Sequence, residues 1–209
     1  MKPSQLVRFL SSVRDFDKPK ILLEQYATNA EMAAEIVVYI DSVSPIDAST
    51  VIDMGCGCGM LSIAAAALGA SYCLGVEIDP EAASICRENV CEMEVEEQVD
   101  IIIADALSLP LPSSSFDLVL MNPPFGTKHN PGMDVKFIER ALSLVKEGGR
   151  VYSIHKSSTR SFIKKKGEEL GAETKAVAQL RWPLSKTYRF HKKNAVDIDV
   201  DLVEFVKRK

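Results

Sequence analysis

Apolar and polar positions along this chain alternate with two periods, one typical of buried strands and one typical of helices. Short apolar runs, each the length of a buried parallel strand, occur at 50–52, 71–76, 99–103, 116–121 and 150–154. Helical patterns follow most of these runs, at 61–68, 81–90, 136–146 and 157–170. Repeated strand–helix units of this kind predict an α/β fold with a mainly parallel sheet.

The two ends of the chain extend this pattern. Residues up to about Lys20 are predicted to form an amphipathic helix and a loop, and Thr28 with Glu31 predicts a capping box that begins a further helix. The residues just before that helix either form a lid over a ligand or simply pack there. Near the other end, a sixth strand is expected at 176–180 and a last strand at 196–202.

The last strand has an alternating composition. Its apolar residues are interleaved with Asp197, Asp199 and Asp201, which predicts one polar side.

The first strand runs directly into a glycine-rich turn, Asp53-Met54-Gly55-Cys56-Gly57-Cys58-Gly59, with a helix after it. A strand, a glycine-rich turn and a helix make a nucleotide-binding βα unit. A dinucleotide fingerprint would require glycine at position 60, where Met60 stands, and the turn lacks the lysine of a P-loop. Alternating glycines preceded by an acid are the pattern of S-adenosylmethionine sites, because the acid favours the cationic amino-acid end of that ligand.

Two further acids end the next two strands. Glu77 lies twenty residues after Gly57, where a carboxylate can accept from both ribose hydroxyls. Asp105 follows the third strand and is placed to accept from an adenine amino group. Alternatively, Glu77 is only an exposed acid at a strand end, and Asp105 is only a loop acid that caps a turn.

The fourth strand ends in Asn122-Pro123-Pro124-Phe125. Each proline fixes its own φ and lacks a donor, so this turn is stiff. The Asn122 amide and the loop carbonyls can bind a planar group that carries an NH2, and Phe125 can offer an aromatic face. The alternative is a plain Asn-Pro turn with a packed phenylalanine.

Composition and charge narrow the class of protein. A hydrophobic content of 46% and a charged content of 26% are ordinary for a globular domain, and neither a membrane-length apolar run nor a secretory signal is visible. The net charge of −4 is unevenly distributed. Residues 156–193 carry 11 Lys and Arg against 3 acids, interleaved with Trp182, Tyr188 and Phe190. Such a segment indicates a nucleic-acid surface rather than only solvated helix and loop faces.

The five cysteines fit reduced thiols in a cytosolic or nuclear protein. Cys56 and Cys58 have no second ligand pair at a suitable spacing, so we expect packed thiols and no metal site. His155 and His191 show no acid partner for a nucleophile–base–acid arrangement, which disfavours a hydrolase.

With these motifs in place, the chain resembles the class I methyltransferases that methylate amino groups. Over nearly its whole length it is similar to the eukaryotic methyltransferase-like protein 5 family, which places N6-methyladenosine in 18S ribosomal RNA. The segments that carry the resemblance are Gln25-Tyr26 with Thr28, 53–59, 122–128, 155–160 and 190–193.

The resemblance implies a Rossmann-like methyltransferase domain with a seven-stranded, mostly parallel sheet, an antiparallel last strand and helices on both faces. We assign 1–28 to an N-terminal helix and cofactor-lid segment, and 29–209 to this domain. The implied cofactor is S-adenosylmethionine. Its expected contacts are Gln25, Thr28, Asp53, Gly55, Gly57, Cys58, Gly59, Leu61, Glu77, Asp105 and Asn122.

Catalysis is expected at Asn122, Pro123, Pro124 and Phe125. The residues expected to bind RNA are Lys156, Arg160, Lys164, Lys165, Lys166, Arg189, His191, Lys192 and Lys193. The family also pairs with a small zinc-binding methyltransferase activator protein along the sheet edge, which we expect at strand 99–103. The implied locations are the nucleus or nucleolus and the cytoplasm.

Three other functions are compatible with parts of the pattern. Asn-Pro-Pro loops also serve methylation of glutamine amides in proteins, but Phe125 and the basic segment favour a nucleic acid. DNA adenine methylation is a second alternative, but the chain has little room for a separate domain that recognises the target. A catalytically silent RNA-binding or ribosome-assembly factor would not need intact cofactor residues.

Overall fold

A computed structural model describes residues 1–126, 130–185 and 195–208 of the chain. The helices are α1 (Pro3–Leu10), η1 (Ile21–Leu23), α2 (Ala30–Val43), α3 (Met60–Ala67), α4 (Pro80–Glu92), α5 (Met133–Leu144), η2 (Ser157–Thr159) and α6 (Arg160–Glu169). The strands are β1 (Thr50–Met54), β2 (Tyr72–Glu77), β3 (Val99–Ile103), β4 (Phe116–Met121), β5 (Val145–Lys156), β6 (Ala172–Ser185) and β7 (Ala195–Lys207). Within the described ranges, no helix is long and apolar enough to span a membrane.

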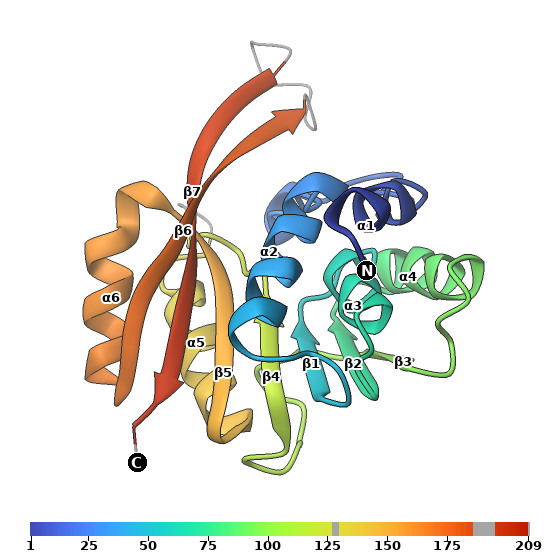
Figure 1. The fold of residues 1–209 in the computed structure, drawn as a ribbon. Coiled ribbons are helices and arrows are strands. Elements are labelled where there is room, and N and C mark those ends of the chain that lie inside the picture. The colour runs from blue at the N-terminus through green and yellow to red at the C-terminus, as the bar shows by residue number, and fades with distance from the viewer. Residues whose placement is uncertain (127–129, 186–194, 209) are drawn as a thin grey trace.

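The seven strands form one sheet in the order β3-β2-β1-β4-β5-β7-β6 (Figure 1). The pairs from β3 across to β5 are parallel, while β7 runs antiparallel to both β5 and β6. The predicted fold class is therefore confirmed, including the antiparallel last strand. The expected position of β3 at the sheet edge is confirmed as well.

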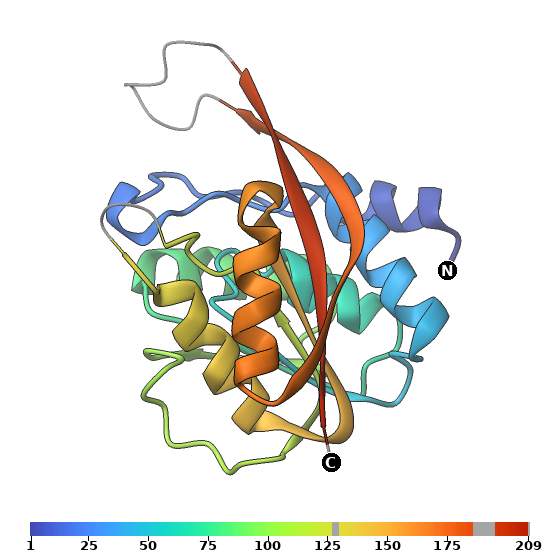
Figure 2. The same ribbon diagram turned by 90° about the vertical axis from the view of Figure 1, so that its left-hand side faces the viewer.

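Helices cover both faces of the sheet because side chains alternate along each strand. Val51 of β1 packs into a core with α1, α2, α3 and α4, whereas Ile52 and Met54 pack into a second core with α5 and α6. The outer parts of β6 and β7 continue past the body of the protein as a two-stranded ribbon (Figure 2). This ribbon rises on the side of the sheet where β1 and β4 end.

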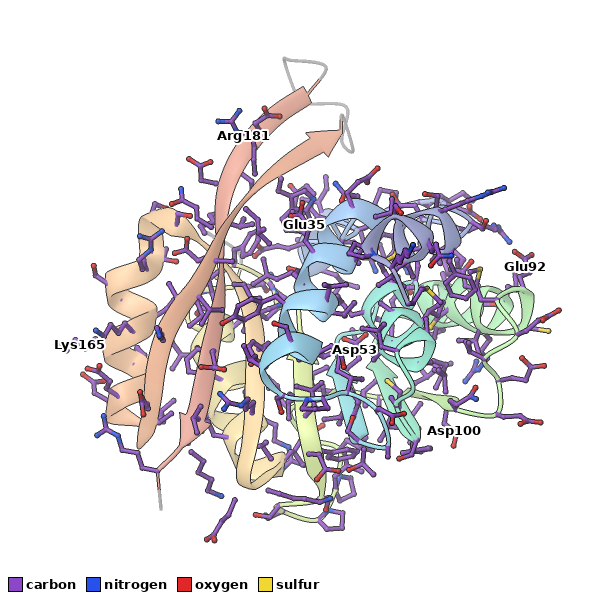
Figure 3. All side chains as sticks on the ribbon, viewed as in Figure 1. Glu35, Asp53, Glu92, Asp100, Lys165 and Arg181 are labelled. Carbon is purple, nitrogen blue, oxygen red and sulfur yellow. The ribbon has the colours of Figure 1, made fainter. Side chains whose placement is uncertain are left out.

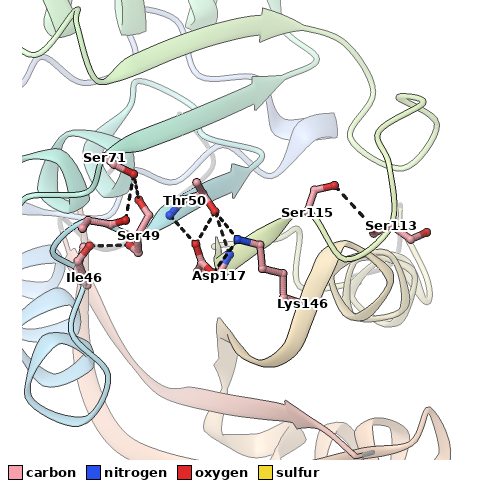
Figure 4. Close-up of polar contacts among 9 residues, drawn as sticks. Ile46, Ser49, Thr50, Ser71, Ser113, Ser115, Asp117 and Lys146 are labelled. Atoms are coloured by element: carbon pink, nitrogen blue, oxygen red, sulfur yellow. Dashed lines mark hydrogen bonds and ion pairs between the residues drawn. The ribbon is translucent and has the colours of Figure 1, made fainter.

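A polar cluster joins the opposite end of the sheet, where β1 and β4 begin (Figure 4). The Asp117 carboxylate accepts from the Thr50 N–H at 2.9 Å and its hydroxyl at 2.6 Å, and from Lys146 Nζ at 2.8 Å. Burial raises the pKa of Asp117, but these hydrogen bonds outweigh burial and leave that pKa below its usual value. The cluster anchors three strands far from their carboxyl ends.

Several local predictions need correction. The N-cap of α2 is Asn29, whose side chain accepts from the Met32 N–H at 2.8 Å, so the capping box at Thr28 is wrong. The last strand does not have a uniformly polar side: Asp197 and Asp199 are exposed, but Asp201 is fully buried. A buried charge is tolerated there because α6 brings a cation to it.

Strand and helix ends also differ from the predictions. Strands β3 and β4 match residue for residue, but β5 begins at Val145, because α5 ends at Leu144 rather than at Lys146. The basic helix begins with the short turn η2 before α6, and β6 is much longer than the predicted 176–180. Pairing with β7 along its whole length sustains β6 beyond its apolar core.

Candidate active site

A cavity of about 540 Å³ lies over the carboxyl ends of β1, β2, β3 and β4. It collects most of the predicted site residues, namely Gln25, Thr28, Asp53, Gly55, Gly57, Cys58, Leu61, Glu77, Asp105, Asn122 and Pro124. Gly59, Pro123 and Phe125 do not line it. The strands place these residues together because the carboxyl ends of parallel strands share one edge of the sheet.

The glycine turn is shaped by close packing. Gly57 has a φ of +55°, and a Cβ there would lie 2.9 Å from the Phe16 ring, so only glycine fits. Gly59 is the N-cap of α3, and a Cβ there would lie 2.6 Å from the Cys86 sulfur. Gly59 therefore supports the turn from behind rather than facing the cavity.

Glu77 is bound into the same turn. Its two carboxylate oxygens accept from the Gly57 N–H at 2.8 Å and from the Asp79 N–H at 2.9 Å. Burial raises the pKa of Glu77, and these backbone donors oppose that rise. A carboxylate oxygen has two lone pairs, so each oxygen of Glu77 can also accept from a ribose hydroxyl.

Asp53 lies in the interior at the end of β1 (Figure 3). Its carboxyl accepts from the Ser62 hydroxyl at 2.7 Å. Burial raises the pKa of Asp53 to about 7. A bound cation would favour the ionised form of this carboxyl, which is the role expected for the acid before the first glycine.

Residues 20–28 of the N-terminal region, which we name the strap, contribute part of the lining of the cavity. The strap is fastened at the start of α4, where Asp79 accepts from Lys20 Nζ at 2.6 Å and from the Gln25 side chain at 2.8 Å. The Gln25 side-chain oxygen in turn accepts from the Lys20 N–H at 2.7 Å. Gln25 thus lines the cavity and also binds the strap to the start of α4.

The strap also contacts the Asn-Pro-Pro-Phe turn. The Asn122 amide nitrogen donates to the Thr28 hydroxyl at 3.2 Å and to the Tyr26 carbonyl at 3.4 Å. These contacts orient the side chain so that its carbonyl oxygen is the acceptor that it offers to a ligand. Thr28 therefore acts on Asn122 instead of capping α2.

Phe125 has two neighbours from the C-terminal part of the chain. Its ring lies 5.9 Å from that of Trp182, edge to face, and Lys156 Nζ lies 5.3 Å from its centroid. Trp182 is buried and lines the cavity. Lys156 is therefore one of the predicted RNA-binding residues, and it contacts the turn.

The other basic residues lie elsewhere. Arg160 donates twice to the buried Asp201, at 2.6 and 2.7 Å. Lys164, Lys165 and Lys166 lie on α6, each within 4.0 Å of a glutamate oxygen of the same helix. Lys165 lies on the outside of the molecule (Figure 3). Arg189, His191, Lys192 and Lys193 lie outside the described residues.

His155 has polar neighbours that the sequence did not reveal. Its Nε2 lies 2.8 Å from the Ser153 hydroxyl, and burial lowers its pKa to about 3, although Asp201 opposes this shift. The three side chains are completely or almost completely buried, which keeps a substrate away from them. We therefore interpret this group as part of the core.

The cysteines are all free thiols. Burial raises the pKa of Cys58 and Cys73, so both thiols stay protonated. Among the described residues, no group of His, Cys, Asp and Glu has an arrangement that suits a metal ion.

Among the residues of the site that sequence reasoning did not assign are Phe16, Glu24, Asn130 and Trp182. All four line the cavity. Glu24 adjoins Gln25, and Trp182 lies in the basic segment, so both had a positional signal. Phe16 and Asn130 reach the site from separate loops, and no local pattern marks them.

The cavity fits S-adenosylmethionine by the chemistry of its donors and acceptors. Asp53 would hold the cationic amino-acid end, Glu77 the ribose hydroxyls and Asp105 the adenine amino group. Ile78 and Leu107 line the cavity as apolar neighbours of these acids. Gly57 has no side chain of its own, and the Phe16 ring occupies the space that a side chain there would need.

This fold and site define a class I, S-adenosylmethionine-dependent methyltransferase, and the model of the methyltransferase small domain matches residues 33–172. The chain is 48% identical to the rRNA N6-adenosine-methyltransferase Mettl5 of Drosophila melanogaster, over 98% of this chain and 96% of that protein. It is 44% identical to the rRNA N6-adenosine-methyltransferase metl-5 of Caenorhabditis elegans, over 99% of both. The chain belongs to the METTL5 family.

Among solved structures, the fold is similar to that of a protein from Pyrococcus horikoshii that is assigned provisionally to the RNA methyltransferases. The TM-score is 0.85 and the sequence identity 32%, and the match covers 99% of this chain and 97% of that one. The similarity includes the strap region and the long C-terminal strands, since it spans nearly the whole chain.

Proposed function

We propose that this chain methylates N6 of an adenosine in ribosomal RNA, and specifically in the 18S RNA of the small subunit. The observation that carries the proposal is the fixed orientation of Asn122, whose amide nitrogen is held by Thr28 and Tyr26. A side chain oriented in this way offers an acceptor for an exocyclic NH2. The family membership supports ribosomal RNA as the substrate class.

The residues of the turn act by positioning. The amino group of adenine is a poor nucleophile because its lone pair is delocalised into the ring. Two acceptors, the Asn122 side-chain oxygen and the Pro123 carbonyl, would each take one N–H and so turn the lone pair out of the ring plane. Bound S-adenosylmethionine supplies an electrophilic methyl group. Holding the acceptor in this geometry accounts for much of the expected rate.

Phe125 supports the target base by stacking, a contact that contributes about 1–3 kcal/mol for a single base. The amino group of a paired adenine is not accessible inside a helix, so the target must be unpaired or flipped out. Lys156 beside Phe125 then lies where the phosphate next to that base can reach it. Both features favour a nucleic acid over a glutamine side chain.

The test is methyl transfer to small-subunit RNA by wild type and by Asn122→Ala, with the nucleosides identified by mass spectrometry. We expect wild type to form N6-methyladenosine. We expect Asn122→Ala to lose at least about a hundredfold in kcat, since it removes one of two positioned acceptors. Thr28→Ser, which keeps the hydroxyl, is the matched control. Near-normal turnover of Asn122→Ala would contradict the proposed role, and methylation at another atom would contradict the proposed reaction.

Binding of RNA is proposed to depend on the basic segment that begins at Lys156. Contacts between cations and phosphates release counterions, so the affinity for RNA should fall steeply with salt. Fluorescence anisotropy with a small-subunit RNA fragment at several salt concentrations measures this slope. An affinity that does not change with salt would count against the assignment.

The exposed edge of the sheet supports the proposed heterodimer with a small zinc-binding methyltransferase activator protein. Among the strands that the structure describes, β3 pairs only with β2, and Ile102 and Ile103 of β3 are 37% and 42% exposed. Because a bare apolar edge promotes aggregation, we expect poor solubility of the chain alone and a stable complex with the partner. A soluble and fully active monomer would refute an obligate partner. Residence in the nucleolus and cytoplasm, where small-subunit RNA is made and used, completes the proposal.

A further inference from the structure

Glu24 of the strap contacts the Asn-Pro-Pro-Phe turn at two places. One carboxylate oxygen accepts from the Phe125 N–H at 3.0 Å, and the other accepts from the Asn130 side chain at 3.2 Å. Asn130 also donates to the Leu22 carbonyl at 3.0 Å. A single carboxylate therefore holds two points of the loop that follows β4.

The backbone at Glu24 is unusual. Its φ of +50° and ψ of +41° are left-handed, a conformation that costs an L-residue free energy and suits glycine. The cap that ends η1 needs only the Glu24 N–H, which donates to the Ile21 carbonyl at 3.0 Å. Glycine would serve that cap without strain, so the glutamate side chain has another purpose at this position.

The contacts of Glu24 are remote in sequence. They join residues 101 and 106 positions apart, and they hold the backbone of Phe125 itself. The same strap is fastened at its other side to Asp79, whose N–H binds the proposed ribose acid Glu77. The strap thus connects the cofactor side of the cavity with the acceptor side.

We propose that Glu24 is a positioning residue for the methyl acceptor: by holding the Phe125 N–H and Asn130, its carboxylate sets the surface on which the target adenine stacks. Glu24 acts through Phe125 and takes no part in the transfer of the methyl group. The inference depends on the proposed function, because it assigns Glu24 to the acceptor side of that reaction.

The first test is Glu24→Gly, which removes the carboxylate and also relieves the backbone strain. With the full-length chain in the preparation that supports wild-type activity, we expect kcat to fall at least about tenfold. The Kd for S-adenosylmethionine should stay within about twofold and the Tm should not fall, because a left-handed glycine is unstrained. Emission from Trp182, the only tryptophan, should shift because its ring packs against Phe125.

The matched control is Glu94→Gly. Glu94 is an exposed glutamate, whereas Glu24 is half-buried, but it shares the left-handed backbone, at a φ of +57°, and its N–H likewise closes a helix end, on the Cys91 carbonyl. It lies after α4 and does not line the cavity. The same substitution in the same backbone conformation should leave kcat and Trp182 emission unchanged.

A pair of variants adds a chemical test. In Glu24→Gln, the new amide can accept from the Phe125 N–H only by turning its own NH2 toward the Asn130 NH2, which places donor against donor. Adding Asn130→Asp changes that contact into a donor–acceptor pair, at the cost of the donation from Asn130 to the Leu22 carbonyl, so the rescue should be incomplete. We expect the double variant to recover part of the kcat that Glu24→Gln loses.

The outcomes separate this inference from the proposed function. An active wild type with Glu24→Gly at full kcat would overturn the inference and leave the proposed function in place. A fall in kcat accompanied by an equal loss of cofactor affinity or by a lower Tm would also overturn it, because that is the result of a merely structural role. If wild type forms no N6-methyladenosine, the proposed function fails first, and Trp182 emission still reports whether Glu24 holds Phe125.

Discussion

The cofactor side and the acceptor side of the cavity are held together in different ways. On the cofactor side, the hydrogen bonds that hold the two acids join residues close in sequence. Ser62 and Asp53 are 9 residues apart, and Gly57 and Glu77 are 20 residues apart. On the acceptor side Asn122 and Phe125 are held by residues 94 to 101 positions away. The first side is a local βα motif, and the second exists only because the strap is folded over it.

This difference has a consequence for mutation. Changes on the cofactor side should alter both binding and stability, because buried backbone donors depend on the same carboxylates. Changes on the acceptor side should alter turnover and leave cofactor binding intact. Four experiments test or refine this distinction, beginning with the largest expected effect and ending with the smallest.

The largest effect is expected from Glu77→Ala. It removes the acceptor for two backbone N–H groups, and each buried donor left unsatisfied costs about 1–3 kcal/mol. We expect cofactor binding to be lost and the free energy of unfolding to fall by about 2–4 kcal/mol. Glu77→Asp, which keeps the carboxylate, is the control. Calorimetry and urea unfolding measure the two quantities, and a stable Glu77→Ala variant with normal affinity would remove the distinction between the two sides.

The second experiment concerns the pH dependence of cofactor affinity. The pKa of Asp53 is raised to about 7 by burial, so below that pH the carboxyl is protonated and offers no charge to a cationic ligand. Affinity should therefore rise with pH up to about 7 and level off above it, by about tenfold between pH 6 and pH 8. Asp53→Asn should bind more weakly at pH 8 and show a flat profile. A wild-type profile equally flat would contradict the assignment of the cation to Asp53.

The third experiment uses His155, whose pKa is lowered to about 3 by burial. As the pH falls below about 6.5, the unfolded chain binds a proton at this residue that the folded chain does not. The contribution of His155 to the free energy of unfolding is therefore fully present at pH 7 and is smaller by about 2 kcal/mol at pH 5. Urea unfolding of His155→Gln should lack this part of the acid destabilisation.

Asp53 affects the pH dependence of the free energy of unfolding in the opposite direction over the same pH range. With a raised pKa it binds a proton in the folded state first, so its contribution to stability grows as the pH falls from about 7. Asp53→Asn should therefore steepen the acid destabilisation, whereas His155→Gln should weaken it. Equal slopes for both variants would show that neither group titrates as its burial implies.

The smallest effect is expected from Lys164→Gln, Lys165→Gln and Lys166→Gln combined. These side chains lie on α6 and are paired with Glu168 or Glu169, so neutralising them should weaken RNA binding only about two- to threefold. Lys156→Gln should have a larger effect per residue because Lys156 lies beside Phe125. Cofactor affinity should not change in either variant, and a larger loss from α6 would place the RNA path on that helix.

Much of the fold was predictable because strands of a parallel sheet are apolar runs of fixed length. The limits of β3 and β4 followed from that pattern alone. The pattern could not predict that β6 and β7 extend beyond the core, because pairing between two strands sustains them there. Nor could it predict the burial of Asp201, which depends on Arg160 approaching from α6.

The amino-acid sequence by itself determined the chemistry on the cofactor side, because an acid, alternating glycines and a second acid lie next to consecutive strands whose ends must meet. It also determined the stiff turn at Asn122, since two prolines fix that backbone. Only the tertiary structure decided which way the Asn122 amide points and what holds Phe125. Those answers come from Thr28 and Glu24, which are distant in sequence and reach the turn only when the chain has closed over its own sheet.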